Sequence, residues 1–176
     1  METYDYITIG AGSSGCVVAS RLSEDGDKRV LLIEAGPPAD DFWIRSPAGM
    51  GRLFLEKRFN WAYFTEEIPG ANDRKIYWPR GRTLGGTSSV NGMVYVRGHP
   101  AVFDHWAQLG NDGWGWQDVL PYFRQSESNA RGESIFHGAR GLLRVRDPVE
   151  RHPTIVDYLA AARRTGIPRD DDLNAQ

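Results

Sequence analysis

Three glycines near the N-terminus have the spacing of a phosphate-binding turn. Gly10, Gly12 and Gly15 form a G-x-G-x-x-G pattern that follows an apolar run and precedes a helical pattern. In such a turn the first glycine allows a tight bend, the second lets backbone approach a pyrophosphate, and the third lets the helix lie close to the strand. Ser13 and Ser14 stand where the helix begins, and its free N–H groups and positive dipole end attract phosphate. These residues predict a site for the pyrophosphate of a dinucleotide.

An acidic residue extends this pattern. A second apolar run ends at Glu34, about 20 positions after the last glycine of the turn. A carboxylate at this strand end can accept hydrogen bonds from both hydroxyls of the adenosine ribose. The motif does not separate nicotinamide from flavin dinucleotides, because both contain the ADP half. The competing interpretation is that the glycines only form a tight turn and that Glu34 is an exposed strand-end charge.

A second glycine-rich segment lies near the middle of the chain. Gly85 and Gly86 are followed by the hydroxyl residues Thr87, Ser88 and Ser89. Such a segment lets backbone pass close to a flat or anionic ligand, and its hydroxyl groups can donate hydrogen bonds to the edge of a heteroaromatic ring. From spacing alone it is either a ligand-contacting loop or a tight structural turn.

The composition is that of a globular protein. The chain has 176 residues, of which 40% are hydrophobic and 25% are charged, and its formal net charge is −2. This balance predicts no general affinity for nucleic acid or for an anionic membrane. We find no apolar run long enough to span a bilayer, and we expect no signal peptide, because residues 1–5 lack the basic and apolar regions of one. The single cysteine, Cys16, cannot form an internal disulfide, which favours the reducing cytoplasm.

The periodicity predicts a βαβ arm followed by irregular, aromatic-rich chain. We expect strands over 4–10, 29–34 and 142–145, helices over 13–24, 45–55, 101–109, 116–123 and 153–164, and a surface loop over 124–140. Asp40–Asp41 and Asp170–Asp172 are expected in solvated turns. The aromatic residues of 37–80 are expected in the core or over the cofactor. Because a dinucleotide-binding sheet needs more than two strands, the chain is expected to be the front part of a larger α/β protein.

Longer motifs add a family resemblance. They are Gly81-Arg82, Leu84-Gly85-Gly86-Thr87-Ser88, Val90-Asn91, Tyr95, Gly98 and Asp104, together with the N-terminal glycine motif, Leu32–Gly36, Asn60-Trp61-Ala62-Tyr63, Gly113–Phe123 and His137-Gly138. In these motifs the chain resembles the glucose-methanol-choline (GMC) family of flavin oxidoreductases, especially its choline-dehydrogenase-like and related alcohol dehydrogenases. The resemblance covers the whole chain but only about the first third of a full-length member.

The resemblance implies an α/β fold and non-covalent FAD. Residues 1–100 would be the N-terminal portion of a Rossmann-like FAD-binding domain, with a βαβ arm over 4–35 and a flavin-covering segment over 36–100. Residues 101–176 would begin a separate α+β substrate domain. By this resemblance Gly10, Gly12, Ser13, Ser14 and Gly15 would hold the pyrophosphate, Glu34 the ribose, and Trp61, Leu84, Gly86, Thr87, Asn91, Gly92, Met93 and Val94 the flavin. Some members attach the flavin to a histidine before the signature asparagine, and this chain has Val90 there.

The implied activity is oxidation of an alcohol CH–OH group, with hydride transfer to flavin N5 and a quinone or O₂ as electron acceptor. Members of the family use a C-terminal histidine as the base. His99, His105, His137 and His152 do not occupy that place, and we expect them to be surface or packing residues. The catalytic base therefore lies outside this chain, no metal site is expected, and the chain alone should be inactive without the remainder of the polypeptide.

Three alternatives remain open at this point. A nicotinamide-dependent dehydrogenase explains residues 6–34 but not the segment 85–91. The second alternative is a protein without catalysis, either a truncated remnant or a nucleotide-binding piece of a larger assembly. Within the family, a few members perform lyase or light-driven decarboxylation chemistry. The sequence identifies neither the alcohol nor the oligomeric state, and it is compatible with peripheral membrane attachment of the complete enzyme.

Overall fold

A computed structural model describes residues 2–175, and the chain divides into two compact units, Met1–Val94 and Tyr95–Gln176. The sequence predicts a boundary after residue 100, a few positions later than this division. The roles assigned to the two parts remain predictions.

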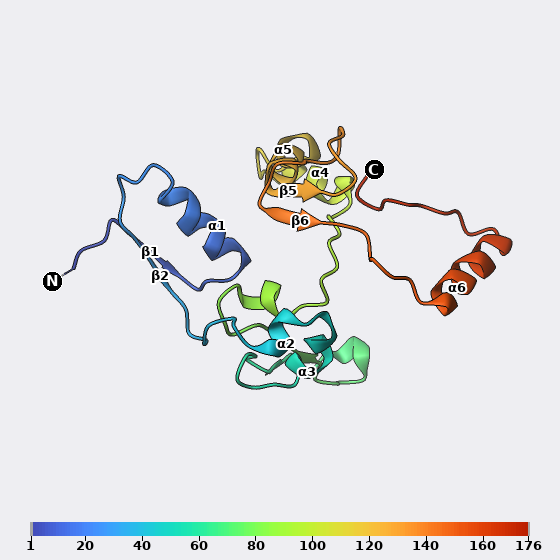
Figure 1. The fold of residues 1–176 in the computed structure, drawn as a ribbon, viewed down its shortest axis with the longest axis horizontal. Coiled ribbons are helices and arrows are strands. Elements are labelled where there is room, and N and C mark those ends of the chain that lie inside the picture. The colour runs from blue at the N-terminus through green and yellow to red at the C-terminus, as the bar shows by residue number, and fades with distance from the viewer. Residues whose placement is uncertain (1, 176) are drawn as a thin grey trace. The chain divides into compact units, whose positions relative to one another are not determined.

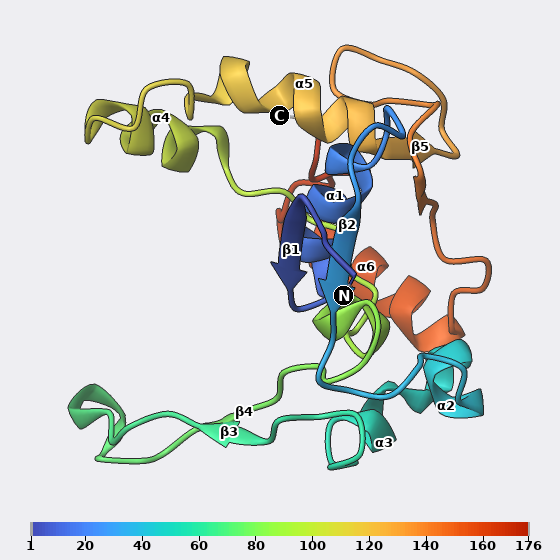
Figure 2. The ribbon, with the colours of Figure 1, turned by 90° about the vertical axis from the view of Figure 1, so that its left-hand side faces the viewer.

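The first unit begins with a βαβ arm. Strand β1 (Tyr6–Ile9) and strand β2 (Val30–Ile33) pair in parallel, and helix α1 (Ser13–Leu22) connects them. Because parallel strands need a crossover connection, the helix crosses back along the strand pair, as Figures 1 and 2 show. The predicted strands and helix are confirmed with slightly shorter ends. Apolar side chains on both strands are exposed to solvent: Ile7 is 59% exposed and Ile33 is 44% exposed.

The rest of the first unit consists of short elements: α2 (Phe42–Arg45), η1 (Pro47–Gly49), α3 (Met50–Leu53), β3 (Tyr63–Phe64), η2 (Pro69–Ala71), β4 (Tyr77–Trp78) and η3 (Gly86–Ser89). Strands β3 and β4 form an antiparallel pair. The core of this unit is a cluster of Leu53, Phe59 and Val90, against which Trp43 and Ile44 pack.

One prediction for this segment was wrong and another was incomplete. A single helix over 45–55 is replaced by three short helical elements, because proline disfavours a helical conformation in the residue before it and Pro47 follows Ser46. Asp41 is not only part of a solvated turn. Its carboxylate Oδ1 accepts a hydrogen bond of 2.9 Å from the backbone N–H of Trp43 and so caps α2.

The second unit contains α4 (Pro100–Gln108), α5 (Trp116–Ser126), β5 (Glu127–Asn129), β6 (Leu143–Val145) and α6 (Pro153–Arg164). Strands β5 and β6 pair in parallel. Helices α4 and α5 meet through the ring of Phe103, whose centroid lies 5.5 to 5.8 Å from those of Trp106, Trp116 and Phe123. Trp116 is 7% exposed and is a packing residue of this unit. Leu109, the C-cap residue of α4, is 67% exposed.

The predicted surface loop over 124–140 contains a buried charged network instead. Glu127 is fully buried, and its carboxylate Oε2 lies 2.6 Å from the guanidinium Nη2 of Arg97. His137 is 4% exposed and places Nδ1 3.1 Å from Glu127 Oε1 and Nε2 2.9 Å from Asp172 Oδ2. Asp172 is therefore not in a simple solvated turn, and it also pairs with Arg131 at 3.0 Å. The network joins segments that are far apart in sequence.

A more exposed ion pair in this unit gives a pH-dependent prediction. Hydrogen bonds from the Arg131 guanidinium, with Nη2 2.7 Å from Oδ1, hold the pKa of the Asp147 carboxyl below its ordinary value of 3.8. A group with a lowered folded-state pKa stabilises the fold above its unfolded pKa, and this contribution is lost as the pH falls through the folded pKa. Asp147→Asn should therefore lower the midpoint of denaturant unfolding slightly at pH 7 and have a smaller effect near pH 2.

The control for this prediction is the exposed Asp157 of α6, where Asp157→Asn should leave the unfolding midpoint nearly unchanged at both pH values. An equal effect of Asp147→Asn at pH 7 and near pH 2 would contradict the assignment of the Arg131–Asp147 pair.

Among residues 2–175, no helix is both long enough and apolar enough to cross a membrane.

Candidate functional site

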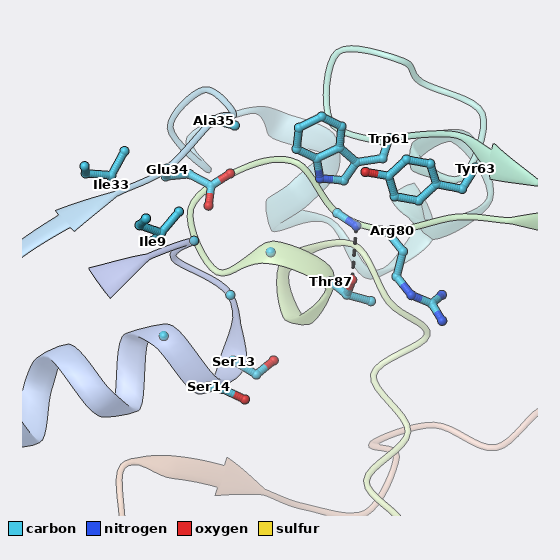
Figure 3. A pocket seen from close by; sticks show the side chains of 15 residues that line it. Ile9, Ser13, Ser14, Ile33, Glu34, Ala35, Trp61, Tyr63, Arg80 and Thr87 are labelled. Carbon is cyan, nitrogen blue, oxygen red and sulfur yellow. Dashed lines mark hydrogen bonds between the residues drawn. The ribbon is translucent and has the colours of Figure 1, made fainter. Parts of the chain in front are cut away.

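The first unit contains a cavity of about 720 Å³ that is lined by both glycine-rich segments (Figure 3). Its volume is within the range of roughly 300–1,000 Å³ that is common for small-molecule sites. The lining residues are Ile9, Gly10, Gly12, Ser13, Ser14, Gly15, Ile33, Glu34, Ala35, Trp61, Tyr63, Arg80, Gly81, Gly86 and Thr87. The ends of β1 and β2, the start of α1 and the segment before and within η3 therefore meet at one cavity.

The start of α1 presents free backbone donors to this cavity. Its N-cap residue is Gly12, which offers no capping side chain, and the first turn contains no acidic residue. The first helical hydrogen bond runs from Cys16 N to Gly12 O, so the N–H groups of the preceding helical residues keep no helical partner. A Cβ on Gly15 would lie 1.9 Å from Gly10 O, which explains why this position needs glycine. The helix N-terminus can therefore bind an anion.

Glu34 is oriented by the backbone around it. Its Oε2 accepts a hydrogen bond of 2.8 Å from Ala11 N, and its Oε1 accepts one of 2.9 Å from Gly36 N. An ionised carboxylate has about four acceptor positions, so each oxygen retains capacity for another donor. Figure 3 shows the carboxylate in the cavity wall between the strand ends and the loop of η3. The fixed carboxylate can accept two hydroxyl donors from one ligand, as a ribose requires.

The two glycine-rich segments are in direct contact. Gly85 N donates a hydrogen bond of 2.7 Å to Ala11 O, and the hydroxyl oxygens of Ser13 and Ser88 are hydrogen-bonded to each other. Gly86 has a φ of +55°, and a Cβ built on it would lie 2.8 Å from the Cα of Gly12. Only a residue without a side chain fits this contact. The segments predicted separately from the sequence thus belong to one cleft.

An aromatic pair forms another side of the cavity. The rings of Trp61 and Tyr63 stack with centroids 5.9 Å apart and an interplanar angle of 4°. They remain 42% and 50% exposed, so aromatic surface is available to a ligand. The guanidinium carbon of Arg82 lies 5.4 Å from the Trp61 ring centroid. The sequence analysis named Trp61 as a contact but missed Tyr63, although both belong to the motif Asn60-Trp61-Ala62-Tyr63.

The comparisons with known proteins agree with this geometry. A family model described as GMC oxidoreductase matches residues 4–176. The chain belongs to this family. It is 42% identical over 180 residues to the mitochondrial choline dehydrogenase of Homo sapiens, covering 98% of this chain and 30% of the relative. It is 47% identical over 175 residues to an oxygen-dependent choline dehydrogenase of Yersinia pseudotuberculosis, covering 97% of this chain and 31% of the relative.

Solved structures extend the match to the fold. Pyridoxine 4-oxidase from Mesorbium loti superposes with a TM-score of 0.90 at 38% identity, covering 98% of this chain and 34% of that one. A formate oxidase from Aspergillus oryzae RIB40, described for an effect on FAD modification, superposes with a TM-score of 0.84 at 30% identity, covering 97% and 32%. This chain thus spans about a third of the length of the GMC relatives that it matches. The α/β fold predicted from the sequence is confirmed for this part.

The cavity of the GMC chain fits FAD, the cofactor that the family and its solved members support. An uncapped helix N-terminus can bind an anion, an oriented carboxylate can accept hydrogen bonds from hydroxyl groups, and an exposed aromatic pair can stack against a flat ring. These three groups lie on different sides of one cavity of suitable volume.

Not every predicted contact lies at the cavity. Gly10, Gly12, Ser13, Ser14, Gly15, Glu34, Trp61, Gly86 and Thr87 line it, whereas Leu84, Asn91, Gly92, Met93 and Val94 do not. Met93 is 59% exposed and has a φ of +56°, and its N–H donates to Asn91 Oδ1 at 2.8 Å. The flavin contact of residues 91–94 remains a prediction.

The remaining candidate groups lie elsewhere. None of the four histidines lines the cavity. His99 and His152 accept hydrogen bonds at the starts of α4 and α6, which are cap roles that the sequence analysis missed. Each of these histidines directly precedes a proline. Because proline is common at the first helical position, this pairing could have predicted both caps. Within residues 2–175 no group of three or more histidine, cysteine or acidic residues could hold a metal ion.

Proposed function

We propose that this chain is the cofactor-binding N-terminal part of an FAD-dependent oxidoreductase that acts on the CH–OH group of an alcohol. The observation that carries the proposal is the direct contact between the two glycine-rich segments at one cavity, through Gly85 N to Ala11 O and the Ser13–Ser88 hydroxyl pair. The names of the similar choline dehydrogenases favour a choline-type alcohol as substrate.

In this proposal each side of the cavity has one task. The N–H groups at the start of α1 neutralise the pyrophosphate, and the carboxylate of Glu34 accepts hydrogen bonds from the ribose hydroxyls. Thr87 fixes the second loop, because its Oγ1 accepts a hydrogen bond of 3.1 Å from Gly81 N. Trp61 and Tyr63 contact a flat ring of the cofactor. When bound, FAD supplies the hydride acceptor.

The base that removes the hydroxyl proton is proposed to come from residues outside this chain, and so is most of the substrate wall. The electron acceptor would be a quinone or O₂, as in the sequence-based prediction. Lyase or decarboxylase chemistry on the same scaffold would still require the same cofactor site.

Non-covalent attachment of FAD is part of the proposal. Val90 occupies the position of the flavin-linked histidine of some members, and its side chain is 2% exposed in the cluster with Leu53 and Phe59. A buried valine can form no bond to a flavin. Acid precipitation of the complete polypeptide should release all the flavin into the supernatant, and flavin that stays with the protein would contradict this part of the proposal.

The test of the proposed function is the absorption spectrum and ligand preference of the purified complete polypeptide. We expect a yellow protein with flavin absorption bands, and alcohol-dependent bleaching of these bands without oxygen. A colourless protein that oxidises an alcohol only with NAD would favour the nicotinamide alternative instead. Retention of FAD without bleaching by any alcohol would favour a non-catalytic binding role.

A prediction at Glu34 tests the adenosine end of the site. Glu34→Gln replaces one carboxylate oxygen by an amide N–H₂ group, so one of the two backbone donors, Ala11 N or Gly36 N, loses its acceptor. We expect the Kd for FAD to rise by about 10- to 100-fold, since hydrogen bonds to charged groups contribute roughly 1.5–3 kcal/mol. Titration of the apoprotein with FAD, followed by flavin fluorescence, measures this change.

The matched control is Glu24→Gln, which removes an exposed charge that pairs with Arg21 outside the cavity. It should leave the Kd for FAD unchanged. If Glu34→Gln also bound FAD as tightly as the unaltered protein, Glu34 would not contact the cofactor.

A further inference from the structure

A buried amide lies directly behind the aromatic side of the cavity. Asn60 is 3% exposed, and its Oδ1 accepts hydrogen bonds of 2.9 Å from both Ala62 N and Arg80 N. Its Nδ2 donates a hydrogen bond of 2.9 Å to Phe54 O. The one side chain therefore ties together the chain after α3, the chain entering β3 and the chain leaving β4.

The hydrogen bond from Ala62 coincides with an unusual backbone conformation. Ala62 has a φ of +52°, in the left-handed region that few non-glycine residues adopt. An asparagine side chain that accepts from the N–H two residues later forms a local turn of its own, which supports such a conformation. A residue of this kind persists only where its surroundings hold it in place, and it often marks a functional site.

The left-handed conformation of Ala62 affects how the neighbouring aromatic rings are oriented. It stands between Trp61 and Tyr63, so its left-handed turn sets the direction in which the chain passes from one ring to the other. The two rings are nearly parallel and line the cavity, as Figure 3 shows. Trp61 is fixed further by the hydrogen bond of 2.9 Å from its N–H to Arg80 O. Its ring also lies against Arg82, whose Nη2 donates to Lys57 O at 3.1 Å.

We propose that Asn60 is a positioning residue for the cofactor site, which holds the Trp61–Tyr63 pair so that the isoalloxazine ring of bound FAD stacks against it. The proposal rests on the proposed FAD function. Asn60 does not line the cavity and acts through Ala62. Both aromatic rings are far more exposed than a core pair, and an oriented but open aromatic surface is suited to a planar heteroaromatic ligand.

The experiment uses the complete polypeptide and measures the Kd for FAD together with the fluorescence of the bound flavin, which stacking on an aromatic ring quenches. Asn60→Ala should raise the Kd about ten-fold and increase the emission of bound FAD, because two N–H groups lose their acceptor. Adding Ala62→Gly should recover most of both changes, since glycine adopts a positive φ without strain.

A second pair of variants keeps the buried amide intact in case Asn60→Ala does not fold. Ala62→Val places a β-branched residue at a positive φ and should reproduce the effect of Asn60→Ala on the Kd and the emission, whereas Ala62→Gly alone should resemble the unaltered protein. The matched control is Asn129→Ala in the second unit, where Asn129 Oδ1 accepts from Arg131 N at 2.9 Å in the same kind of turn. It should lower the unfolding temperature without changing the Kd or the emission.

Three results would overturn the proposal. Unchanged Kd and emission in Ala62→Val or in folded Asn60→Ala would show that the turn does not position the rings. A double variant as impaired as Asn60→Ala would show that Asn60 acts on something other than the Ala62 turn. If the unaltered protein itself failed to bind FAD, the proposed function would fail first, and this proposal with it.

Discussion

Gly86→Ala should lower the affinity of the complete polypeptide for FAD by roughly 30- to 1,000-fold. The added Cβ would lie 2.8 Å from the Cα of Gly12, and the φ of +55° at this position disfavours any side chain. Overpacking and a left-handed alanine together cost roughly 2–4 kcal/mol, and each 1.4 kcal/mol is about a factor of ten in affinity. Because the Cβ is fixed to the backbone of residue 86 and the Cα belongs to the backbone of Gly12, neither atom can move away without separating the two loops.

The control for Gly86 is Gly51→Ala in α3. A Cβ at Gly51 would meet no atom within 4 Å, and its φ is not positive. This variant should bind FAD as the unaltered protein does and be equally or slightly more stable, because alanine is a better helix former than glycine. Calorimetric titration with FAD compares the two variants. Equal affinities would show that the contact between the loops is not needed for binding.

Glu127→Ala should destabilise the fold by about 3–5 kcal/mol, since removal of one partner of a buried ion pair leaves an uncompensated charge. The side chains of Arg97 and Glu127 are only 2% and 0% exposed, and their charged atoms are 2.6 Å apart. Alanine would also remove the acceptor of the 2.8 Å hydrogen bond from Asn129 Nδ2 and of the interaction with His137 Nδ1. Denaturant unfolding of the complete polypeptide, followed by tryptophan fluorescence, measures the loss.

An exposed ion pair in the same unit supplies the comparison. Glu133 pairs with Arg124 at 3.3 Å, with exposed fractions of 60% and 38%. Glu133→Ala should cost at most about 1 kcal/mol, because solvent screens such pairs. The double variant Arg97→Met, Glu127→Leu should be more stable than Glu127→Ala, since apolar side chains of similar size need no charged partner. Equal losses at Glu127 and Glu133 would contradict the structural role of the buried pair.

The βαβ arm could be predicted from the sequence because its signals are local. Gly10, Gly15 and Glu34 act within one short stretch, and the period of the apolar residues changes where the strand gives way to the helix. The same holds for α6, whose predicted bounds agree with the observed Pro153–Arg164. The single helix expected over 45–55 failed because the effect of Pro47 on Ser46 outweighed the apolar spacing.

The features that could not be predicted from the sequence depend on contacts between segments that are far apart in the chain. Nothing in the polar run 124–140 indicates that Glu127 and His137 are buried, because their partners Arg97 and Asp172 lie far away in the sequence. Likewise the contact of Ser13 with Ser88 followed only from the fold. For Asn60 the sequence offered a motif but no role, since one of the two N–H groups that donate to its Oδ1 belongs to Arg80, 20 positions further along the chain.

Hydrogen–deuterium exchange of the complete polypeptide, with and without FAD, tests most directly whether both glycine-rich segments hold one dinucleotide. We expect FAD to slow exchange of the backbone amides in 10–16 and in 84–88 together, with the same dependence on FAD concentration. NAD at the same concentrations should not protect 84–88, because it shares only the ADP half with FAD. Protection of 10–16 alone, with 84–88 exchanging as in the apoprotein, would contradict the account.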